Sequence, residues 1–125
     1  MKTRLSAALL FLALPGAALA ANDVVVHRDP GCGCCEKWAQ ALRAKLGRTV
    51  VMRDDASRGA LQRRAGMPGT LASCHSAMVD GYLIEGHVPV ADIKRLLATR
   101  PVGVRGIAVA GMPIGSEGME VAGAA

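Results

Sequence analysis

The sequence predicts an α/β sandwich with a small mixed sheet, and three observations lead to it. Short β-branched runs alternate along the chain with segments whose apolar residues recur at helical spacing. An Asp-Gly pair, the strongest short hairpin signal, separates two further apolar runs. The resulting order is strand, helix, strand, helix, hairpin and helix, followed by a C-terminal extension. This order is typical of helices packed on a mixed sheet.

The first predicted elements are a strand and a helix joined by a turn. Residues 23–27 form a β-branched run without helical periodicity and predict a buried strand, which ends at the turn-forming residues 29–31. From 35 to 46 the apolar residues recur at helical spacing, and Gly47 is a suitable helix terminator. The loop and first helical turn between them contain three of the four cysteines.

A second strand and a short helix follow. Residues 49–52 are mostly β-branched and predict a strand. Asp55 or Ser57 can cap a helix that runs to about Arg64, and Pro68 lies just beyond its end.

A hairpin and a last helix complete the predicted sandwich. Residues 73–79 and 82–87 flank the Asp-Gly turn and predict two antiparallel strands. A helix then begins at about Pro89, because proline suits the first helical position, and it ends at Pro101.

Residues 1–20 are typical of a secretory signal peptide. Two basic residues form a positive head, residues 7–14 form an apolar run, and the Ala-Leu-Ala sequence at 18–20 is a cleavage site. An uncleaved membrane anchor is the alternative, but the apolar run is shorter than the roughly 20 residues of a spanning helix. We therefore expect an exported, periplasmic protein with a single domain at 21–125 and no membrane span.

Charge and composition argue against a nucleic-acid binder. The formal charge is +5, and it falls by 2 to +3 when Lys2 and Arg4 leave with the signal peptide. Trp38 and Tyr82 are the only aromatic residues after residue 20. Nucleic-acid binders usually combine a denser basic face with stacking rings. We expect a monomer whose basic residues form a solvated face.

The four cysteines are unevenly spaced: Cys32, Cys34 and Cys35 fall within four residues, and Cys74 lies far from them. In an oxidising compartment, exposed thiols form disulfides unless a metal or a reductant keeps them reduced. A disulfide between the neighbours Cys34 and Cys35 would be strained. The clustering favours chemistry over structural cross-linking, with a stable Cys32–Cys35 disulfide as the alternative.

The predicted hairpin places Cys74 opposite His87. A two-residue turn makes Val79 and Tyr82 neighbours, and the same register continued along the strands pairs residue 74 with residue 87. Directly opposite side chains share a face, with β-carbons roughly 5 Å apart, so these two can share a metal ion. His75 is expected on the other face unless a bulge intervenes, as either a ligand or a structural histidine.

Thiolates with an imidazole form a soft site suited to copper(I), zinc or iron–sulfur clusters. Zinc usually takes two CxxC-like pairs, and this chain has one. Copper(I) needs only two or three sulfur ligands, so the adjacent Cys34 and Cys35 can each bind a different ion. We predict that one or more copper(I) ions are bound by Cys32, Cys34, Cys35, Cys74, His75 and His87.

The C-terminal extension offers two further sulfurs, at Met112 and Met119. A thioether can bind copper(I), but methionine is also ordinary packing material. The favoured interpretation is that the extension folds back over the core, with Val104, Ile107 and Val109 supplying an extra strand or an apolar lid.

The CxxC motif from Cys32 to Cys35, placed between the first strand and the first helix, resembles that of the thioredoxin fold. The resemblance implies a thioredoxin-like sandwich in which the third strand begins beside the end of the first. Thioredoxins carry a cis-proline just before that third strand. This chain has Ser-Cys-His at 73–75 instead, and its nearest proline is Pro68.

The segments CGCCEKW, LASCHSAMVDGYLIEGHVP, DIKRLLATRP and GIAVAGMPIGSEGMEV resemble the small exported bacterial proteins called CopG-type copper-resistance proteins, a family long classed as a domain of unknown function. The resemblance covers essentially all of the chain after the signal peptide. It implies a thioredoxin-like fold, cysteine-based copper binding and an association with other copper-handling proteins. The cysteines it implies are Cys32, Cys34, Cys35 and Cys74, with His75 and His87 in the matched segments.

We therefore predict a periplasmic copper(I)-binding protein that buffers or delivers copper, with other periplasmic copper-handling proteins as partners. One alternative is a thiol-disulfide oxidoreductase or copper-linked redox protein, in which Cys32 attacks and Cys35 resolves. The other is an exported structural module with a passive disulfide. The sequence leaves enzymatic activity undecided.

Overall fold

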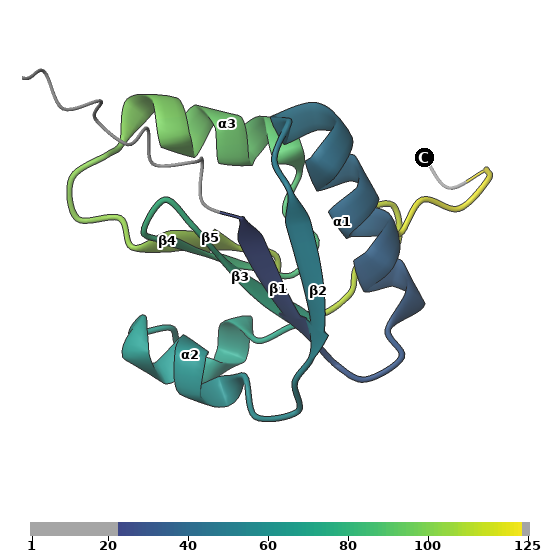
Figure 1. Cartoon of the computed structure of the whole chain (residues 1–125), viewed down its shortest axis with the longest axis horizontal. Coiled ribbons are helices and arrows are strands. Elements are labelled where there is room, and N and C mark those ends of the chain that lie inside the picture. Colours follow the sequence, from purple (N-terminus) through teal and green to yellow (C-terminus); the bar gives the residue numbers. More distant parts are fainter. Residues whose placement is uncertain (1–22, 124–125) are drawn as a thin grey trace, which may run out of the picture.

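A computed structural model describes residues 23–123, and the predicted signal peptide lies outside them (Figure 1). The order of elements is β1 (Val24–Arg28), α1 (Gly33–Leu46), β2 (Val50–Asp54), α2 (Gly59–Arg64), a 3-10 turn (Gly69–Leu71), β3 (His75–Val79), β4 (Tyr82–Glu85), α3 (Val90–Thr99) and β5 (Gly106–Ala108). The predicted order is confirmed. Of the two predictions for residues 104–109, the extra strand is found, as β5.

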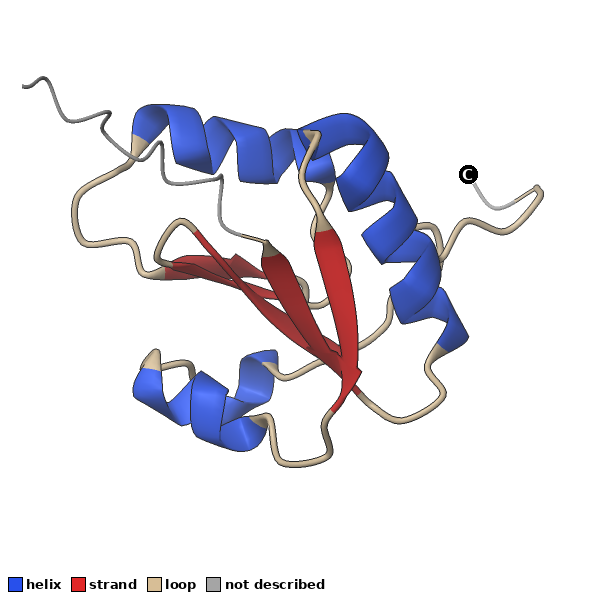
Figure 2. Ribbon diagram, viewed as in Figure 1, coloured by secondary structure: helices blue, strands red, loops and turns tan. Residues whose placement is uncertain are grey.

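The strands form one mixed sheet in the order β2-β1-β3-β4-β5 (Figure 2). β1 runs parallel to β2 and antiparallel to β3, and β4 runs antiparallel to β3 and parallel to β5. The predicted α/β class with a small mixed sheet is therefore confirmed.

The hairpin register agrees with the prediction. Val79 pairs with Tyr82, and the remaining β3–β4 pairs follow in the same register. Asp80 and Gly81 have φ values of 48° and 89°, and a two-residue turn of this kind requires positive φ at both central residues. The last β3–β4 pair, Ser76 with Glu85, lies two residues from Cys74 and from His87, so this register brings those two residues to the same end of the hairpin.

α1 and α3 lie together on one side of the sheet, and α2 lies on the opposite side (Figures 1 and 2). Trp38 and Leu42 of α1 and Ile93 of α3 are fully buried in one core cluster with Val26 and Ile84 of the sheet. Removing such large apolar side chains from water provides the main free-energy gain on folding. The apolar core therefore lies between the sheet and these two helices.

α2 approaches the sheet through polar contacts, and no residue of this helix is fully buried. Its Gln62 donates to the Glu85 carboxylate at 2.9 Å and to Ser76 Oγ at 3.2 Å. Strand side chains alternate between faces, so Ser76 and Glu85 lie on the face opposite Ala77 and Ile84. A polar layer therefore separates α2 from the sheet.

The start of α2 differs from the prediction. Asp55 and Ser57 do not cap the helix, because they form a turn of their own in which the Ser57 N–H donates to Asp55 Oδ1 at 2.9 Å. The helix consequently begins later, at Gly59. The side chain of Asp can replace a backbone acceptor in this way, which makes turns and caps hard to distinguish from sequence.

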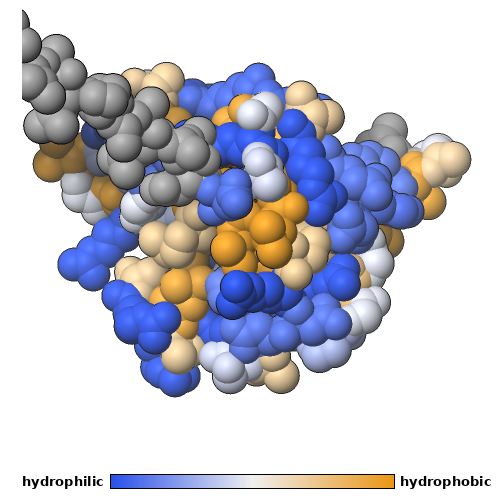
Figure 3. All heavy atoms as spheres, in the orientation of Figure 1, coloured by the Kyte–Doolittle hydropathy of each residue, from blue (hydrophilic) through white to orange (hydrophobic). Residues whose placement is uncertain are grey.

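Figure 3 shows apolar side chains near the centre of one face, over β1 and β2, with hydrophilic residues around them. Val51 of the edge strand β2 is among the exposed large apolar residues. Within residues 23–123, no helix combines the length and apolar character needed to cross a bilayer.

Candidate metal centre

The sulfur atoms come from two segments that meet at one end of the sheet. Cys32 caps α1, because its Sγ accepts a hydrogen bond from the Cys35 N–H at 3.3 Å. The helix therefore begins at Gly33, slightly earlier than predicted. Cys74 lies directly before β3, and its carbonyl accepts a hydrogen bond from the Asp29 N–H at 2.9 Å. This bond holds the β1–α1 loop against the start of β3.

The four sulfurs form a compact group. Cys32 and Cys35 are joined by a disulfide, whereas Cys34 and Cys74 are free thiols. Cys34 Sγ lies 3.4 Å from Cys32 Sγ, and Cys74 Sγ lies 3.3 Å from Cys35 Sγ. A free thiol therefore stands at each end of the disulfide, and all four sulfurs fall within 4.8 Å of one another. The predicted meeting of the cysteines is confirmed.

His87 faces Cys74, as the hairpin register predicts. Its Nε2 lies 3.3 Å from Cys74 Sγ, and both residues are buried. Its Nδ1 lies 2.8 Å from the carbonyl oxygen of Glu117. Because a carbonyl oxygen only accepts, His87 donates from Nδ1 to Glu117, and Nε2 is the ring nitrogen that faces Cys74. Contacts of this kind orient histidines that bind metals, so His87 is suited to bind an ion through Nε2.

The prediction that His75 points away from Cys74 and His87 is wrong. His75 Nδ1 lies 3.4 Å from Cys74 Sγ, and the three residues form a second group able to hold a metal ion. The prediction extended strand alternation to Cys74 and His87, which lie outside the strands, whereas His75 lies within β3. Gly86 has a φ of 70°, so the chain turns before His87 and the strict alternation ends there.

His75 is fully buried between two rings. Its ring centroid lies 4.4 Å from that of Trp38 and 4.9 Å from that of His87. Its Nε2 is buried and has no hydrogen-bond partner among the described residues. Burial lowers the pKa of the His75 imidazole to about 3, and the charges of His87 and Arg58 also lower it. His75 is therefore neutral near pH 7, the form that binds metals.

The low pKa of His75 predicts acid sensitivity. The unfolded chain takes up the proton near pH 6.5, but the folded protein does so only near pH 3. Stability is therefore full above pH 6.5 and falls by up to about 1.4 kcal/mol per pH unit between these values. In urea unfolding between about pH 7 and pH 4, His75→Gln is expected to show a shallower decline than the wild type. Equal slopes would contradict this account.

The buried thiol of Cys74 stays protonated near neutral pH. Burial raises the pKa of this thiol to about 11, and the neighbouring Cys34 also raises it. Metals bind the thiolate rather than the thiol. A metal ion that binds Cys74 must therefore displace its proton, and binding is expected to strengthen as the pH rises.

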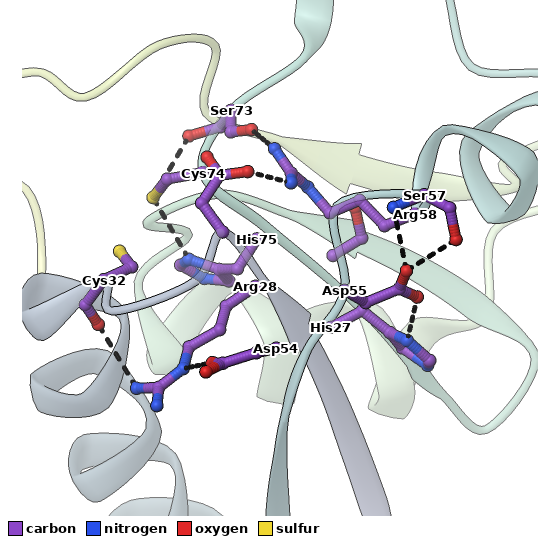
Figure 4. A network of polar contacts seen from close by, with 12 residues as sticks. His27, Arg28, Cys32, Asp54, Asp55, Ser57, Arg58, Ser73, Cys74 and His75 are labelled. Atoms are coloured by element: carbon purple, nitrogen blue, oxygen red, sulfur yellow. Dashed lines mark hydrogen bonds and ion pairs between the residues drawn. The ribbon is translucent and has the colours of Figure 1, made fainter.

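Arg28 lies beside the cysteine loop, and the His27–Asp55 pair lies apart from it (Figure 4). Arg28 donates from Nη1 to the Cys32 carbonyl at 3.3 Å and from Nε to Asp54 at 2.7 Å. His27 Nδ1 lies 2.8 Å from Asp55 Oδ2, and His27 belongs to neither metal-binding group. The third histidine therefore lies outside the candidate centre.

The C-terminal segment packs against α1 beside the sulfurs. A Cβ on Gly118 would lie 2.8 Å from the backbone nitrogen of Trp38 and 3.1 Å from the backbone carbonyl oxygen of Cys34. Glycine at this position, with a φ of 84°, therefore permits the close approach that brings the Glu117 carbonyl to His87. The predicted return of the extension over the core is confirmed.

The two C-terminal methionines differ in exposure. Met112 is 54% exposed, and Met119 is half-buried. Binding of copper by either thioether stays a prediction.

Two residues of the site were not foreseen from the sequence. Glu117 acts through its backbone carbonyl, and Arg58 bonds the backbone oxygen of Ser73, next to Cys74. Every residue type has a backbone carbonyl, so the sequence does not indicate which carbonyl will make such a contact. The acidic residue of the Arg58–Asp29 ion pair lies on a different loop, so charge spacing along one element could not indicate it.

Two solved structures of a protein named copper resistance protein CopG resemble this chain. Form 1 is 41% identical with a TM-score of 0.75, and the match covers 84% of this chain and 82% of that one. Form 2 is 42% identical with a TM-score of 0.73, covering 82% and 80% respectively. The chain belongs to the CopG family of copper resistance proteins.

The family model that matches is described as a protein of unknown function, DUF411, and it spans residues 71–119. This part of the CopG-type chain contains Cys74, both buried histidines and Glu117. No curated protein matches the chain. The resemblance noted from the sequence motifs is therefore confirmed, and a copper-related function is supported.

Proposed function

We propose that this CopG family member is a periplasmic copper(I)-binding protein that buffers or delivers copper. The observation that carries the proposal is the meeting of four cysteine sulfurs and two buried imidazoles at one end of the sheet. The similarity to proteins named for copper resistance supports copper as the metal. The periplasmic location rests on the N-terminal sequence, and fractionation of cells tests it.

The donor set suits copper(I) better than a hard cation. Thiolate sulfur and imidazole nitrogen are soft or intermediate ligands, and no carboxylate belongs to either group found among residues 23–123. Cys74 belongs to both groups, so it can bridge ions held by the other cysteines and by the histidines. The proposed ligands are Cys32, Cys34, Cys35, Cys74, His75 and His87.

The disulfide makes the proposed binding dependent on reduction. With Cys32 and Cys35 oxidised, only Cys34 and Cys74 remain as thiols. Disulfide sulfur is a much weaker ligand than thiolate, which is the metal-binding form of cysteine. Addition of two electrons and two protons to the disulfide restores two thiols. The fully reduced protein therefore offers twice as many thiols as the oxidised one.

Anaerobic copper(I) titration of the two forms tests this dependence. The reduced protein is expected to take up more copper, and more tightly, than the protein with the Cys32–Cys35 disulfide. Metal analysis after gel filtration measures the copper retained by each form. If neither form retains copper, the proposed function fails. If both forms retain equal amounts, the disulfide does not control binding.

Thiol-disulfide exchange is a second candidate function, and the disulfide in the CxxC motif favours it. In that reaction a reduced Cys32 attacks a substrate disulfide, Cys35 resolves the mixed disulfide, and the substrate leaves with two thiols. Cys32→Ser would then abolish reduction of a model disulfide, whereas Cys74→Ser would not. Equal activity of the wild type and Cys32→Ser would exclude this candidate.

A further inference from the structure

Arg58 contacts a residue beside each of the two segments that carry the sulfurs, although it is distant from every cysteine in the sequence (Figure 4). It directly precedes α2, and its side chain is only 12% exposed. One guanidinium nitrogen, Nη1, pairs with the carboxylate of Asp29. The other, Nη2, donates to the carbonyl oxygen of Ser73 at 2.5 Å. The side chain therefore bridges two loops.

Each of the bridged residues is coupled to a sulfur. Asp29 belongs to the turn that leads to Cys32, and its backbone N–H donates to the Cys74 carbonyl at 2.9 Å. Ser73 is joined to Cys74 by a peptide bond. A displacement of either residue relative to the other changes the separation between the cysteine loop and the Cys74 sulfur.

The backbone N–H and the hydroxyl of Ser73 also form hydrogen bonds. Its N–H donates to Glu85 Oε1 at 2.8 Å, and its hydroxyl donates to the Gly111 carbonyl. Glu85 is fully buried and also accepts from Gln62. Because Ser73 is fixed on these sides, the bond from Arg58 ties the cysteine loop to a rigid point rather than to a mobile one.

The shape of arginine matters for this bridge. Its planar guanidinium presents several donors in a fixed geometry, so one side chain can hold a carboxylate and a carbonyl at a set spacing. Lysine has a single ammonium on a flexible stem and cannot reproduce that geometry. The conservative change Arg58→Lys therefore keeps the charge and removes the fixed spacing.

We propose that Arg58 is a positioning residue that sets the distance between the cysteine loop and Cys74. Its consequence for copper rests on the proposed function: a correct spacing lets both segments supply thiolates to the same ions. The spacing itself exists in the metal-free protein and can be measured without copper.

A metal-free test uses the pair formed by Cys35 and Cys74. In a Cys32→Ser, Cys34→Ser background these two thiols remain, and in the folded protein their sulfurs are 3.3 Å apart. Equilibration with oxidised and reduced glutathione gives the effective concentration of one thiol at the other. Arg58→Lys is expected to lower this value several-fold. An unchanged value would overturn the proposal.

A matched control keeps the test specific. Arg64, at the end of α2, lines a surface cavity with Met78 and Val104, and within residues 23–123 no hydrogen bond or ion pair joins its side chain to either sulfur segment. Arg64→Lys is expected to leave the effective concentration at its original value. An equal fall in both variants would overturn the proposal, because it would show a general loosening of α2.

A second variant covers the case in which Arg58→Lys fails to fold. Asp29→Asn removes the charge at the other end of the bridge, and this side chain is 52% exposed, so the fold should tolerate it. It is expected to lower the effective concentration in the same direction as Arg58→Lys. A value equal to that of the parent in folded Asp29→Asn would count against the bridge.

The copper experiment separates this proposal from the proposed function. With all four cysteines present, Arg58→Lys is expected to weaken copper(I) binding by about 10- to 100-fold, the range typical of residues that support metal ligands. If the wild type binds no copper but Arg58→Lys still lowers the effective concentration, the positioning role stands and the proposed function fails. Unchanged copper affinity in Arg58→Lys would overturn the link between spacing and binding.

Discussion

The double replacement Cys34→Ser, Cys74→Ser is expected to abolish tight copper(I) binding. These are the two free thiols, and Cys74 is the one residue shared by both groups able to hold a metal ion. The loss should exceed the roughly 10- to 100-fold effect of changing a residue that only supports a ligand. Competition with a copper(I) chelator, under anaerobic and reducing conditions, measures the change in affinity.

His27→Gln is the matched control for that experiment. It removes an imidazole that pairs with Asp55 and belongs to neither group. Its copper affinity is expected to equal that of the wild type. Wild-type affinity in the double cysteine variant would show that the ions bind elsewhere.

Replacement of Trp38 by alanine is expected to cost about 3–5 kcal/mol of stability, the range for truncating a large buried aromatic residue. Trp38 is fully buried, its Nε1 donates to the Val88 carbonyl at 2.8 Å, and its ring packs on His75. The variant therefore loses core packing and a wall of the metal centre together. Urea unfolding followed by far-ultraviolet circular dichroism measures the loss, because Trp38 is the only tryptophan and its fluorescence disappears with it.

Trp38→Phe separates packing from the hydrogen bond. Phenylalanine keeps most of the apolar contact and leaves the Val88 carbonyl unpaired, a change that costs about 1–3 kcal/mol. The alanine variant should therefore be clearly less stable than the phenylalanine variant. Equal stabilities would contradict a packing role for the ring.

The meeting of Cys74 with His87 could be predicted from the sequence because one turn determines it. Asp80 and Gly81 permit a two-residue connection, and that connection fixes the pairing of every residue along β3 and β4. The position of the cysteine loop followed from the strand and helix patterns on either side of it. Local rules therefore sufficed for placing Cys74 near His87, whereas the meeting of Cys74 with the cysteine loop was expected from the resemblance to the thioredoxin fold.

That His75 shares a side with Cys74 and His87 could not be predicted, because it depends on where strand alternation stops: His75 lies within β3, whereas Cys74 precedes β3 and His87 follows β4. Gly86 turns the chain with a positive φ, and a Cβ there would lie 2.4 Å from the Val109 carbonyl oxygen. That close approach involves the strand β5, whose position depends on the whole fold. A sequence pattern shows the alternation of a strand but not the residue at which tertiary contacts end it.

The contacts of Arg58 and Glu117 were also beyond prediction. Arg58 joins Asp29 and Ser73, and Glu117 reaches His87 through its backbone, all across long sequence separations. The state of the CxxC motif was left open as well, because reduced and oxidised cysteines have the same sequence. These features depend on three-dimensional packing and on redox conditions rather than on local pattern.

We propose that the reduced cysteines and the two buried histidines hold copper(I). The most direct test is to isolate the protein anaerobically from copper-supplemented cells and to measure bound copper and free thiols on the same sample. We predict bound copper and, after its removal by a chelator, four reactive thiols, consistent with the four cysteines of the chain. Protein that carries no copper and retains its Cys32–Cys35 disulfide under these conditions would contradict the claim.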